Sequence, residues 1–312
     1  MTPLVVGMLT GVFGLRMQEQ CIMISTSPHG NSGMDDSNTN SDKLTAFLQQ
    51  HRKVLVLTGA GISTGSGIPD YRDHNGQWKR RPPVQHQDFV SSPLVRQRYW
   101  ARSLAGWPVM QHAHPNDAHR DIATLERMGF VRQVVTQNVD RLHQKAGSID
   151  TIDLHGRADE VVCLQCGWRE SRAATHERCA RLNPEYATLT AATAPDGDAD
   201  LETDFSAFRV PGCPQCDGML KPDVVFFGDN VPRARVDAVF AALAESSALL
   251  VIGSSLMVYS GFRFAREASA SNKAVAILTR GRTRADELAT LKLDADISTV
   301  LTGAMSALAS SR

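Results

Sequence analysis

The chain has 312 residues, which suggests about two domains, and 42% hydrophobic with 21% charged residues is an ordinary globular composition. Its 33 basic and 33 acidic residues balance, so the overall charge gives no argument for binding nucleic acid or an anionic membrane. No uninterrupted apolar run reaches the roughly 18 residues that a membrane-spanning helix needs. These properties lead us to expect a cytoplasmic protein without nucleic-acid or membrane partners.

The N-terminal region lacks the pattern of a folded domain. The apolar stretch 1–15 has no positively charged segment before it, so we do not expect a secretory signal. Residues 31–42 are rich in Ser, Asn and Asp, a composition typical of disorder. We expect residues 1–40 to be disordered or to result from a mis-assigned start, with Met17 or Met34 as the alternative start.

From residue 41 onward, short apolar strands alternate with helices. In chain order, the pattern predicts a helix over 41–51, a strand over 53–57, a helix over 116–128, strands over 131–136, 151–154 and 224–227, a helix over 231–246, a strand over 249–252, a helix over 261–270 and a strand over 274–278. Such alternation is typical of an α/β fold, a parallel sheet with helices on both faces.

A cysteine-containing segment interrupts this alternation. We expect it to be loop-rich and to form a small inserted module over about 161–219, within a large domain of residues 41–160 and 220–312. Its acidic part, 194–204, contains Gly and Pro and is expected to be a surface insertion.

The loop after the first predicted strand suits a phosphate group, because glycine lets backbone N–H groups approach an anion. Gly59 and Gly61 match the first two glycines of the dinucleotide fingerprint, but Thr64 stands where the third is expected. On its own this is a weak signal, and a plain strand-to-helix turn explains it equally well. Arg72 is a fork-shaped donor suited to phosphate, although Asp70 and Asp73 could instead hold it in an ion pair.

Polar residues follow three other predicted strands: 136–140 (Thr-Gln-Asn-Val-Asp), 155–156 (His-Gly) and 253–255 (Gly-Ser-Ser). Ligands of open α/β sheets bind beyond the carboxyl ends of the strands. One His-Gly pair alone indicates no more than a histidine in a turn. The whole set favours a ligand site at this edge of the sheet.

Four of the six cysteines form two C-x-x-C pairs, Cys163 with Cys166 and Cys213 with Cys216. Four thiolates in two knuckles are typical of a closed, structural zinc site, in which no position is open for a catalytic water. Redox dithiols are the competing interpretation, and two pairs so far apart in sequence fit it less well. Cys21 and Cys179 belong to neither pair.

Taken together and in this order, the motifs resemble those of the sirtuins, the NAD-dependent protein-lysine deacylases. The resemblance covers about residues 41–309 and rests on 59–63, 67–72, 136–140, 155–156, the two cysteine pairs, 221–228 and 253–256. Finer details resemble class II sirtuins, the group of the mitochondrial lipoamidase-type sirtuin: 81–86, 96–102, 106–108, 194–198 and 257–261.

The resemblance implies a Rossmann-like large domain, one structural Zn²⁺, and NAD as a co-substrate that meets an acyl-lysine protein or peptide in the cleft between domain and module. It implies that His155 and Asn138 are catalytic. The implied NAD contacts are Gly59, Ala60, Gly61, Ile62, Asp70, Tyr71, Arg72, Gln137, Asn138, Val139, Asp140, Gly253, Ser254, Ser255, Thr279, Arg280 and Gly281. The implied peptide-binding edge is Val224, Val225, Phe226 and Phe227. We expect a monomer.

In the implied reaction, the acyl-amide oxygen attacks the ribose carbon as nicotinamide leaves, and His155 acts as general base on a ribose hydroxyl. The products are deacylated lysine and O-acyl-ADP-ribose. Thr279 and Arg282 depart from the family's usual asparagine and proline in the adenosine-side loop, which bears on NAD affinity. Class II relatives imply a preference for longer or branched acyl groups over acetyl.

Tyr99 and Arg102 have the spacing of a desuccinylase motif, but their surroundings match class II better, and a helix with packed aromatics explains the spacing equally well. Three rival functions share parts of the pattern: a protein ADP-ribosyltransferase, a hydride-transfer dehydrogenase and a non-enzymatic zinc and NAD module. The broken fingerprint disfavours the dehydrogenase, and His155 with Asn138 disfavours the mere binder. The acidic insertion and the absence of a basic helix in the sequence disfavour zinc-finger DNA binding.

Overall fold

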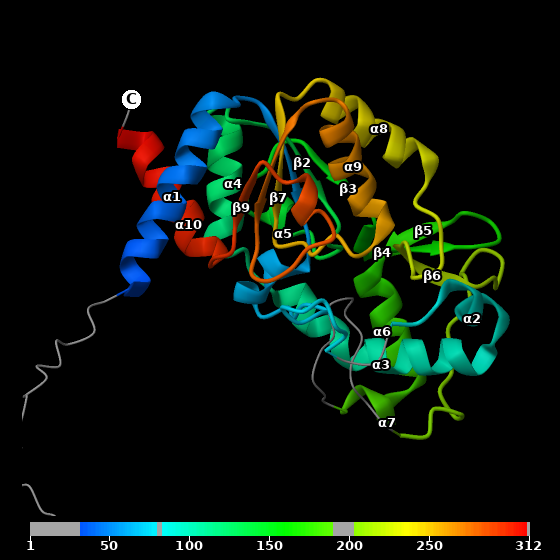
Figure 1. Ribbon diagram of the computed structural model, residues 1–312. Helices are drawn as coiled ribbons and strands as arrows, with labels where there is room; N and C mark the ends of the chain where they lie inside the picture. The colour runs from blue at the N-terminus through cyan, green and yellow to red at the C-terminus, as the bar shows by residue number, and fades with distance from the viewer. Residues whose placement is uncertain (1–31, 80–82, 190–202, 311–312) are drawn as a thin grey trace, which may run out of the picture. The chain divides into compact units, whose positions relative to one another are not determined.

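A computed structural model describes residues 32–79, 83–189 and 203–310 of the chain (Figure 1). Cys21, most of the acidic insertion 194–204 and the class II segment 194–198 lie outside the described residues. Within the described ranges, no helix has the length and apolar character needed to cross a membrane.

The centre of the fold is a six-stranded sheet in the order β3-β2-β1-β7-β8-β9, and all of its neighbouring strands are parallel. Its strands are β1 (Val54–Thr58), β2 (Val131–Thr136), β3 (Thr151–Asp153), β7 (Ala248–Ile252), β8 (Ala274–Leu278) and β9 (Leu291–Leu293). This is the order of a Rossmann sheet, with its switch point between β1 and β7. The predicted α/β class with a parallel sheet is therefore confirmed.

Helices cover both faces of this sheet (Figure 1). One face carries α1 (Ser32–Gln50), α4 (Asp117–Arg127) and α10 (Ile297–Ser310), and the other carries α8 (Arg233–Ala244) and α9 (Tyr259–Ala270). Successive side chains of β1 alternate between the two cores: Val54 and Val56 join the first, whereas Leu55 and Leu57 join the second. A strand buried on both faces reads as a continuous apolar run, which is why the sequence identified these strands.

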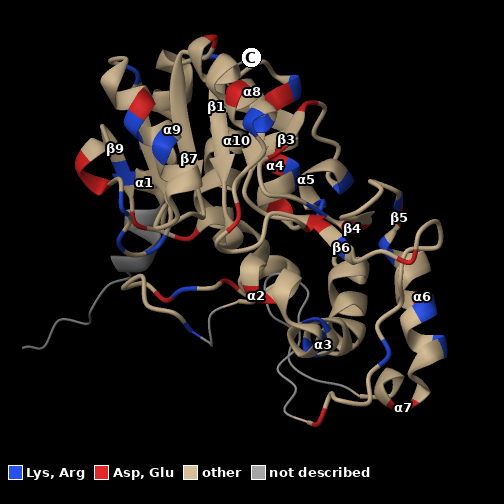
Figure 2. Ribbon diagram, turned by 90° about the vertical axis from the view of Figure 1, so that its right-hand side faces the viewer, with Lys and Arg blue, Asp and Glu red and all other residues tan. Residues whose placement is uncertain are grey.

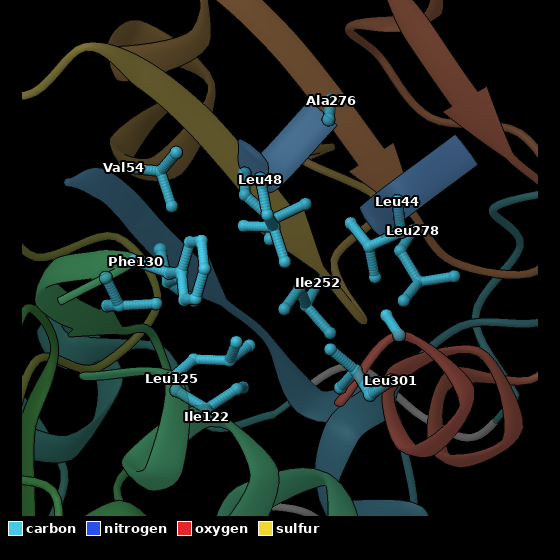
Figure 3. Packing of buried hydrophobic residues seen from close by; sticks show 14 of the residues in the cluster. Leu44, Leu48, Val54, Ile122, Leu125, Phe130, Ile252, Ala276, Leu278 and Leu301 are labelled. Atoms are coloured by element: carbon cyan, nitrogen blue, oxygen red, sulfur yellow. The ribbon is translucent and has the colours of Figure 1, made fainter. Parts of the chain in front are cut away.

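Figure 3 shows the first of these cores. Leu44 and Leu48 of α1 lie against Ile252 of β7, and Leu125 of α4 approaches the same centre, all of them fully buried. Each such leucine contributes about 2 kcal/mol through burial. The structure differs from the expected disorder over 31–42, because α1 begins at Ser32. Helix formation is cooperative. The C-terminal half of α1, which is anchored in the core by Leu44 and Leu48, therefore supports helical structure in the residues that precede it.

A second, antiparallel sheet in the order β5-β4-β6 forms the small module. Its elements are β4 (Gly156–Cys163), β5 (Arg169–Ser171), α6 (Arg172–Leu182), α7 (Pro184–Ala187) and β6 (Leu220–Val224). The segment between the cysteine pairs is thus less loop-rich than expected. Its core also includes α2 (His86–Ser91) and α3 (Pro93–His112), two helices that lie outside the predicted module.

The predicted strand over 224–227 was wrong in both extent and sheet. β6 ends at Val224 and pairs antiparallel with β4 instead of joining the parallel sheet. Beyond Val224, the Phe226 ring lies in an aromatic cluster, 5.2 Å from the Tyr99 ring centre and 5.3 Å from that of Phe89. The described residues also form three short elements: η1 (Ala60–Ser66), α5 (Leu142–Lys145) and η2 (Asp286–Leu288).

Candidate active site

A cavity of about 710 Å³ lies beyond the carboxyl ends of β1, β2 and β7. All of the residues predicted to be catalytic, to contact NAD or to form the peptide edge line it, except Gly281. Its volume is within the range of small-molecule sites. The structure therefore brings together residues that the sequence spreads over more than 200 positions, from Gly59 to Arg280.

The floor of the cavity depends on close contact between two glycine-containing turns. Gly59 N–H donates to the carbonyl of Ile252, and Gly61 N–H donates to that of Gly253 at 2.8 Å. A Cβ atom on Gly59 would lie 2.7 Å from Ser254 Cβ, and one on Gly253 would lie 2.4 Å from Ile62 N. Gly253 also has a φ of +64°, a conformation that favours glycine. These glycines allow two backbone segments to meet where the cavity begins.

Amide and hydroxyl groups form a connected network on one side of the cavity. Asn138 Nδ2 donates to Gly59 O and to Ser63 Oγ, and Ser63 in turn donates to Asp140 at 2.7 Å. Burial raises the pKa of Asp140, while its hydrogen bonds from Leu142 N–H and Ser63 oppose that rise. The network fixes the orientation of the Asn138 amide beside the glycine loop.

Gln137 connects two strand ends. Its Nε2 donates to Thr58 O at 3.1 Å and to Ser254 Oγ at 2.8 Å, so it links the ends of β1 and β7. Polar side chains after neighbouring parallel strands thus hold one another in place.

The environment of His155 defines its tautomer. Its Nδ1 lies 3.0 Å from the carbonyl oxygen of Gln137, which can only accept, so Nδ1 carries the proton. Nε2 therefore has the lone pair and accepts from Ser260 Oγ at 2.8 Å. Burial lowers the pKa of His155 to about 4, and the charges of Arg235 and Arg263 lower it further, against the Gln137 hydrogen bond. The imidazole is neutral at pH 7 and presents a basic nitrogen in the cavity.

Arg72 is not held by the carboxylates that precede and follow it. Its Nη1 donates to Gly76 O at 2.7 Å, and its guanidinium carbon lies 4.0 Å from the centre of the Trp78 ring. Asp70 pairs with Lys79 instead, and the Asp73 carboxylate accepts from backbone N–H groups of its own turn. The ion-pair alternative for Arg72 is therefore wrong, and its guanidinium borders the cavity on a tryptophan face.

The adenosine-side loop is only partly in the cavity. Thr279 and Arg280 line it, and Arg280 forms an ion pair with Asp296 at 3.3 Å. Gly281 has a φ of +78°, and its N–H donates to Asp294. A Cβ there would lie 2.3 Å from His74 O, so Gly281 serves the close approach of two loops.

The segment Val224–Phe227 lines the cavity, but part of its backbone is already paired. Val225 N–H donates to His155 O at 2.8 Å, and Phe227 O accepts from His86 N–H at 2.8 Å. It therefore differs from the extended edge that we expected. The pairing with His155 connects this segment of the small module directly to the histidine.

The four paired cysteines meet at one point. The sulfurs of Cys163, Cys166, Cys213 and Cys216 all lie within 4.8 Å of one another. The Cys163–Cys216 and Cys166–Cys213 sulfur distances are 3.6 and 3.7 Å. A tetrahedral Zn²⁺ with about 2.3 Å bonds separates its sulfurs by roughly 3.8 Å, so the donor set fits zinc. Cys179 is buried on α6, apart from this cluster.

Sequence reasoning missed several residues of the site. Ser260 contacts His155 directly but was noted only as part of the class II segment 257–261, without a role, and Trp78 and Arg263 line the cavity outside the quoted motifs. Asn116 was expected only as the first residue of the helix over 116–128. It caps α4, and its Nδ2 also donates to Ile62 O at 2.8 Å and so holds the glycine loop.

Comparisons with known proteins agree with this geometry. The model of the Sir2 family matches residues 59–260. A Bordetella bronchiseptica NAD-dependent protein deacetylase is 52% identical over 269 residues, 86% of this chain and 98% of that protein. The mitochondrial lipoamidase sirtuin-4 of Bos taurus is 49% identical over 256 residues, 81% of each chain. A solved Sir2 structure with a p53 peptide and NAD⁺ has 30% identity and a TM-score of 0.69, covering 86% of this chain and 98% of that one.

Proposed function

Since this chain belongs to the Sir2 family and is an NAD-dependent protein deacetylase, we propose that it transfers the acyl group of an acyl-lysine to ADP-ribose and releases nicotinamide. Bound NAD supplies an electrophilic ribose carbon and a leaving group. The observation that supports this proposal best is the neutral His155, whose basic nitrogen lies in a cavity with the amide groups of Gln137 and Asn138.

His155 acts as the general base in this proposal. Its Nε2 accepts a proton from a ribose hydroxyl, and the Ser260 hydroxyl rotates away to admit that oxygen. The Nδ1–H bond to the Gln137 carbonyl stabilises the positive charge that then develops on the ring. A base of this kind must be unprotonated at the working pH, as the low pKa of His155 ensures.

The residues of the sheet edge bind NAD in this proposal. The turns at Gly59–Ile62 and Gly253–Ser255 expose backbone close to the cavity and accommodate the phosphates, together with the guanidinium of Arg72. The amide of Asn138 and the buried Asp140, linked through Ser63, would form the nicotinamide pocket. The other predicted contacts, from Asp70 and Tyr71 to Thr279 and Arg280, line the same cavity.

The zinc site has a structural role. All four ligands are cysteine sulfurs, so the metal keeps no open position for water or substrate. It fixes β4, which begins directly after His155, and β6, which leads into the segment that contacts His155. Residues Val225–Phe227 bind the substrate backbone through backbone N–H and C=O groups other than the already paired Val225 N–H and Phe227 O. The catalytic unit is a monomer of residues 41–312.

We propose that the enzyme prefers acyl groups longer or more branched than acetyl, as in class II sirtuins. The likeness to a lipoamidase sirtuin at 49% identity supports this. The Tyr99–Arg102 spacing gives no support for succinyl, because the Tyr99 ring packs among Phe89, Trp100 and Phe226 and does not line the cavity.

The test is a mass-resolved product assay with NAD and peptides that carry acetyl-, lipoyl-, biotinyl- or hydroxymethylglutaryl-lysine. We expect nicotinamide and O-acyl-ADP-ribose in equal amounts, with kcat/KM higher for the longer groups. A clear advantage for acetyl would contradict the acyl preference. ADP-ribose attached to protein without loss of the acyl group would instead indicate an ADP-ribosyltransferase.

A further inference from the structure

Three arginines surround an exposed tyrosine at the rim of the cavity. The guanidinium carbons of Arg263, Arg266 and Arg284 lie 5.1, 5.4 and 5.8 Å from the centre of the Tyr259 ring. Arg263 and Arg266 follow Tyr259 by four and seven positions on α9, one face of a helix, and Arg284 comes from the loop after β8. Figure 2 shows basic positions on α9 in blue. We call these three residues the arginine cluster.

The charge of the arginine cluster is not neutralised. Within the described parts of the chain, none of its members forms an ion pair, whereas Arg280 on the same side of the cavity pairs with Asp296. The Arg284 guanidinium donates to the Met257 carbonyl and lies 4.4 Å from the centre of the Phe262 ring, and Arg263 Nε is buried without a hydrogen-bond partner. Like charges around one ring repel each other, and an anion placed among them would relieve that repulsion.

The position of the cluster connects it to the catalytic histidine. Ser260, the residue after Tyr259, donates to His155 Nε2. Tyr259 and Arg263 line the cavity together with the segment Val225–Phe227. A substrate that reaches His155 through this cavity would therefore pass between Tyr259 and the segment Val225–Phe227.

The exposed surface here has apolar and cationic parts. Val258 is 38% exposed and Tyr259 is 42% exposed, and the exposed Arg266 and Arg284 stand outside the cavity lining. A cofactor held by the glycine turns would not need charges placed there. A peptide with carboxylates near its reactive residue would contact both parts.

We propose that the arginine cluster binds acidic side chains that flank the acyl-lysine in the protein substrate. This inference rests on the proposed function, because it assumes that an acyl-lysine reaches His155. It gives the enzyme a preference for sequence context that the balanced charge of the whole chain does not indicate.

The test measures binding separately from turnover. Two labelled acyl-lysine peptides are compared by fluorescence anisotropy without NAD, one with Glu at the flanking positions and one with the isosteric Gln. We expect the Glu peptide to bind about fivefold more tightly at about 20 mM salt, and the ratio to fall toward one at about 300 mM. In the Arg266→Gln/Arg284→Gln variant, the ratio should fall toward one at low salt.

Arg181→Gln is the matched control, because Arg181 is a 69% exposed arginine on α6 in the small module, and this variant should keep the fivefold ratio. Thermal unfolding shows whether the double variant is folded. If it is not, the single variant Arg266→Gln is used in its place. A Glu-to-Gln ratio near one in the wild type, or no measurable binding of either peptide, overturns the inference. Turnover is measured afterwards with NAD, and Glu-selective binding without deacylation would contradict the proposed function alone.

Discussion

Gln137 and Ser254 are held at the cavity by strands of the parallel sheet, whereas Phe226 and Phe227 are held there by the small module. The sheet strands are buried on both faces, and their ends are linked by hydrogen bonds within the domain. The small module has three short antiparallel strands, an aromatic core and four cysteine sulfurs. One side of the site thus depends on apolar burial on both faces of a sheet, and we expect the other to depend also on a metal held by the four cysteines.

Because different interactions stabilise the two sides of the cavity, each side can be perturbed separately. The groups that we assign to NAD binding and catalysis belong to the sheet, and the substrate segment belongs to the module. Each perturbation below affects mainly one side.

Removal of zinc has the largest expected effect. Structural zinc contributes on the order of 10 kcal/mol in small zinc modules, so chelation or Cys163→Ser should unfold β4 and β6. Hydrogen exchange should become fast in residues 156–163 and 220–224 and stay slow in β1 and β7. Cys179→Ala is the control, because this cysteine is buried outside the cluster. Equal loss of protection in both sheets would show that the two sides are not separable.

Gly253→Ala disturbs the sheet side. A Cβ would lie 2.4 Å from Ile62 N at a φ of +64°, so we expect a loss of about 3 kcal/mol in the free energy of unfolding and weaker NAD binding. Gly129 is the matched control, with a φ of +78° and no atom within 4 Å of an added Cβ. Gly129→Ala should cost only about 1 kcal/mol in urea unfolding. Equal effects of the two substitutions would contradict the close contact between the turns.

Besides His155, two further buried histidines should make the sheet side sensitive to acid. Burial lowers the pKa of His119 to about 4 and that of His143 to about 3, below the ordinary value near 6.5. As the pH falls below about 6.5, these histidines therefore bind protons in the unfolded chain before they do so in the folded chain. Each of them should lower the free energy of unfolding by about 2 kcal/mol at pH 5.

Unfolding free energy measured from pH 7 to pH 5 should show this decline. His143→Gln should reduce its slope, whereas His112→Gln, at an exposed helix end, should leave the slope as in the wild type. A slope that does not change in His143→Gln would refute the assignment.

Ser260→Ala has the smallest expected effect. The hydroxyl donates to the unprotonated Nε2 of His155 and so stabilises the neutral ring. Its removal should raise the pKa of His155 and move the acid limb of kcat/KM upward by about 0.5–1 pH unit. Ser260→Thr keeps the hydroxyl and should restore the profile. NMR titration of the His155 ring checks the same shift, and an unchanged pKa would exclude this role of Ser260.

The contrast between the parallel sheet and the small module also explains which features could be predicted from the sequence. β8 has the predicted bounds, Ala274–Leu278, because a strand buried on both faces is a continuous apolar run. The cysteine pairs and the polar strand ends were also identified, since their chemistry is local. For α3, a helix with packed aromatics was considered around Tyr99, but its bounds were not predicted, because Tyr99, Trp100 and Ala101 are all buried and the helix has no single apolar face.

Other features depend on contacts between distant segments. Beyond the end of β6 at Val224, Phe226 packs against Tyr99, more than 100 residues away in the sequence. The contact of Ser260 with His155 likewise spans 105 positions. Residue spacing does not predict contacts between such distant positions. The contact of Ser260 with His155 and the arginine cluster were therefore identified only from the structure.

The central claim, that His155 on the sheet side is the base for acyl transfer, is tested most directly by His155→Ala. Formation of O-acyl-ADP-ribose is measured by mass, with NAD binding measured in parallel by calorimetry. We expect product formation to fall by about 10²–10⁴-fold while NAD still binds. Product formation within about tenfold of the wild type would contradict the claim.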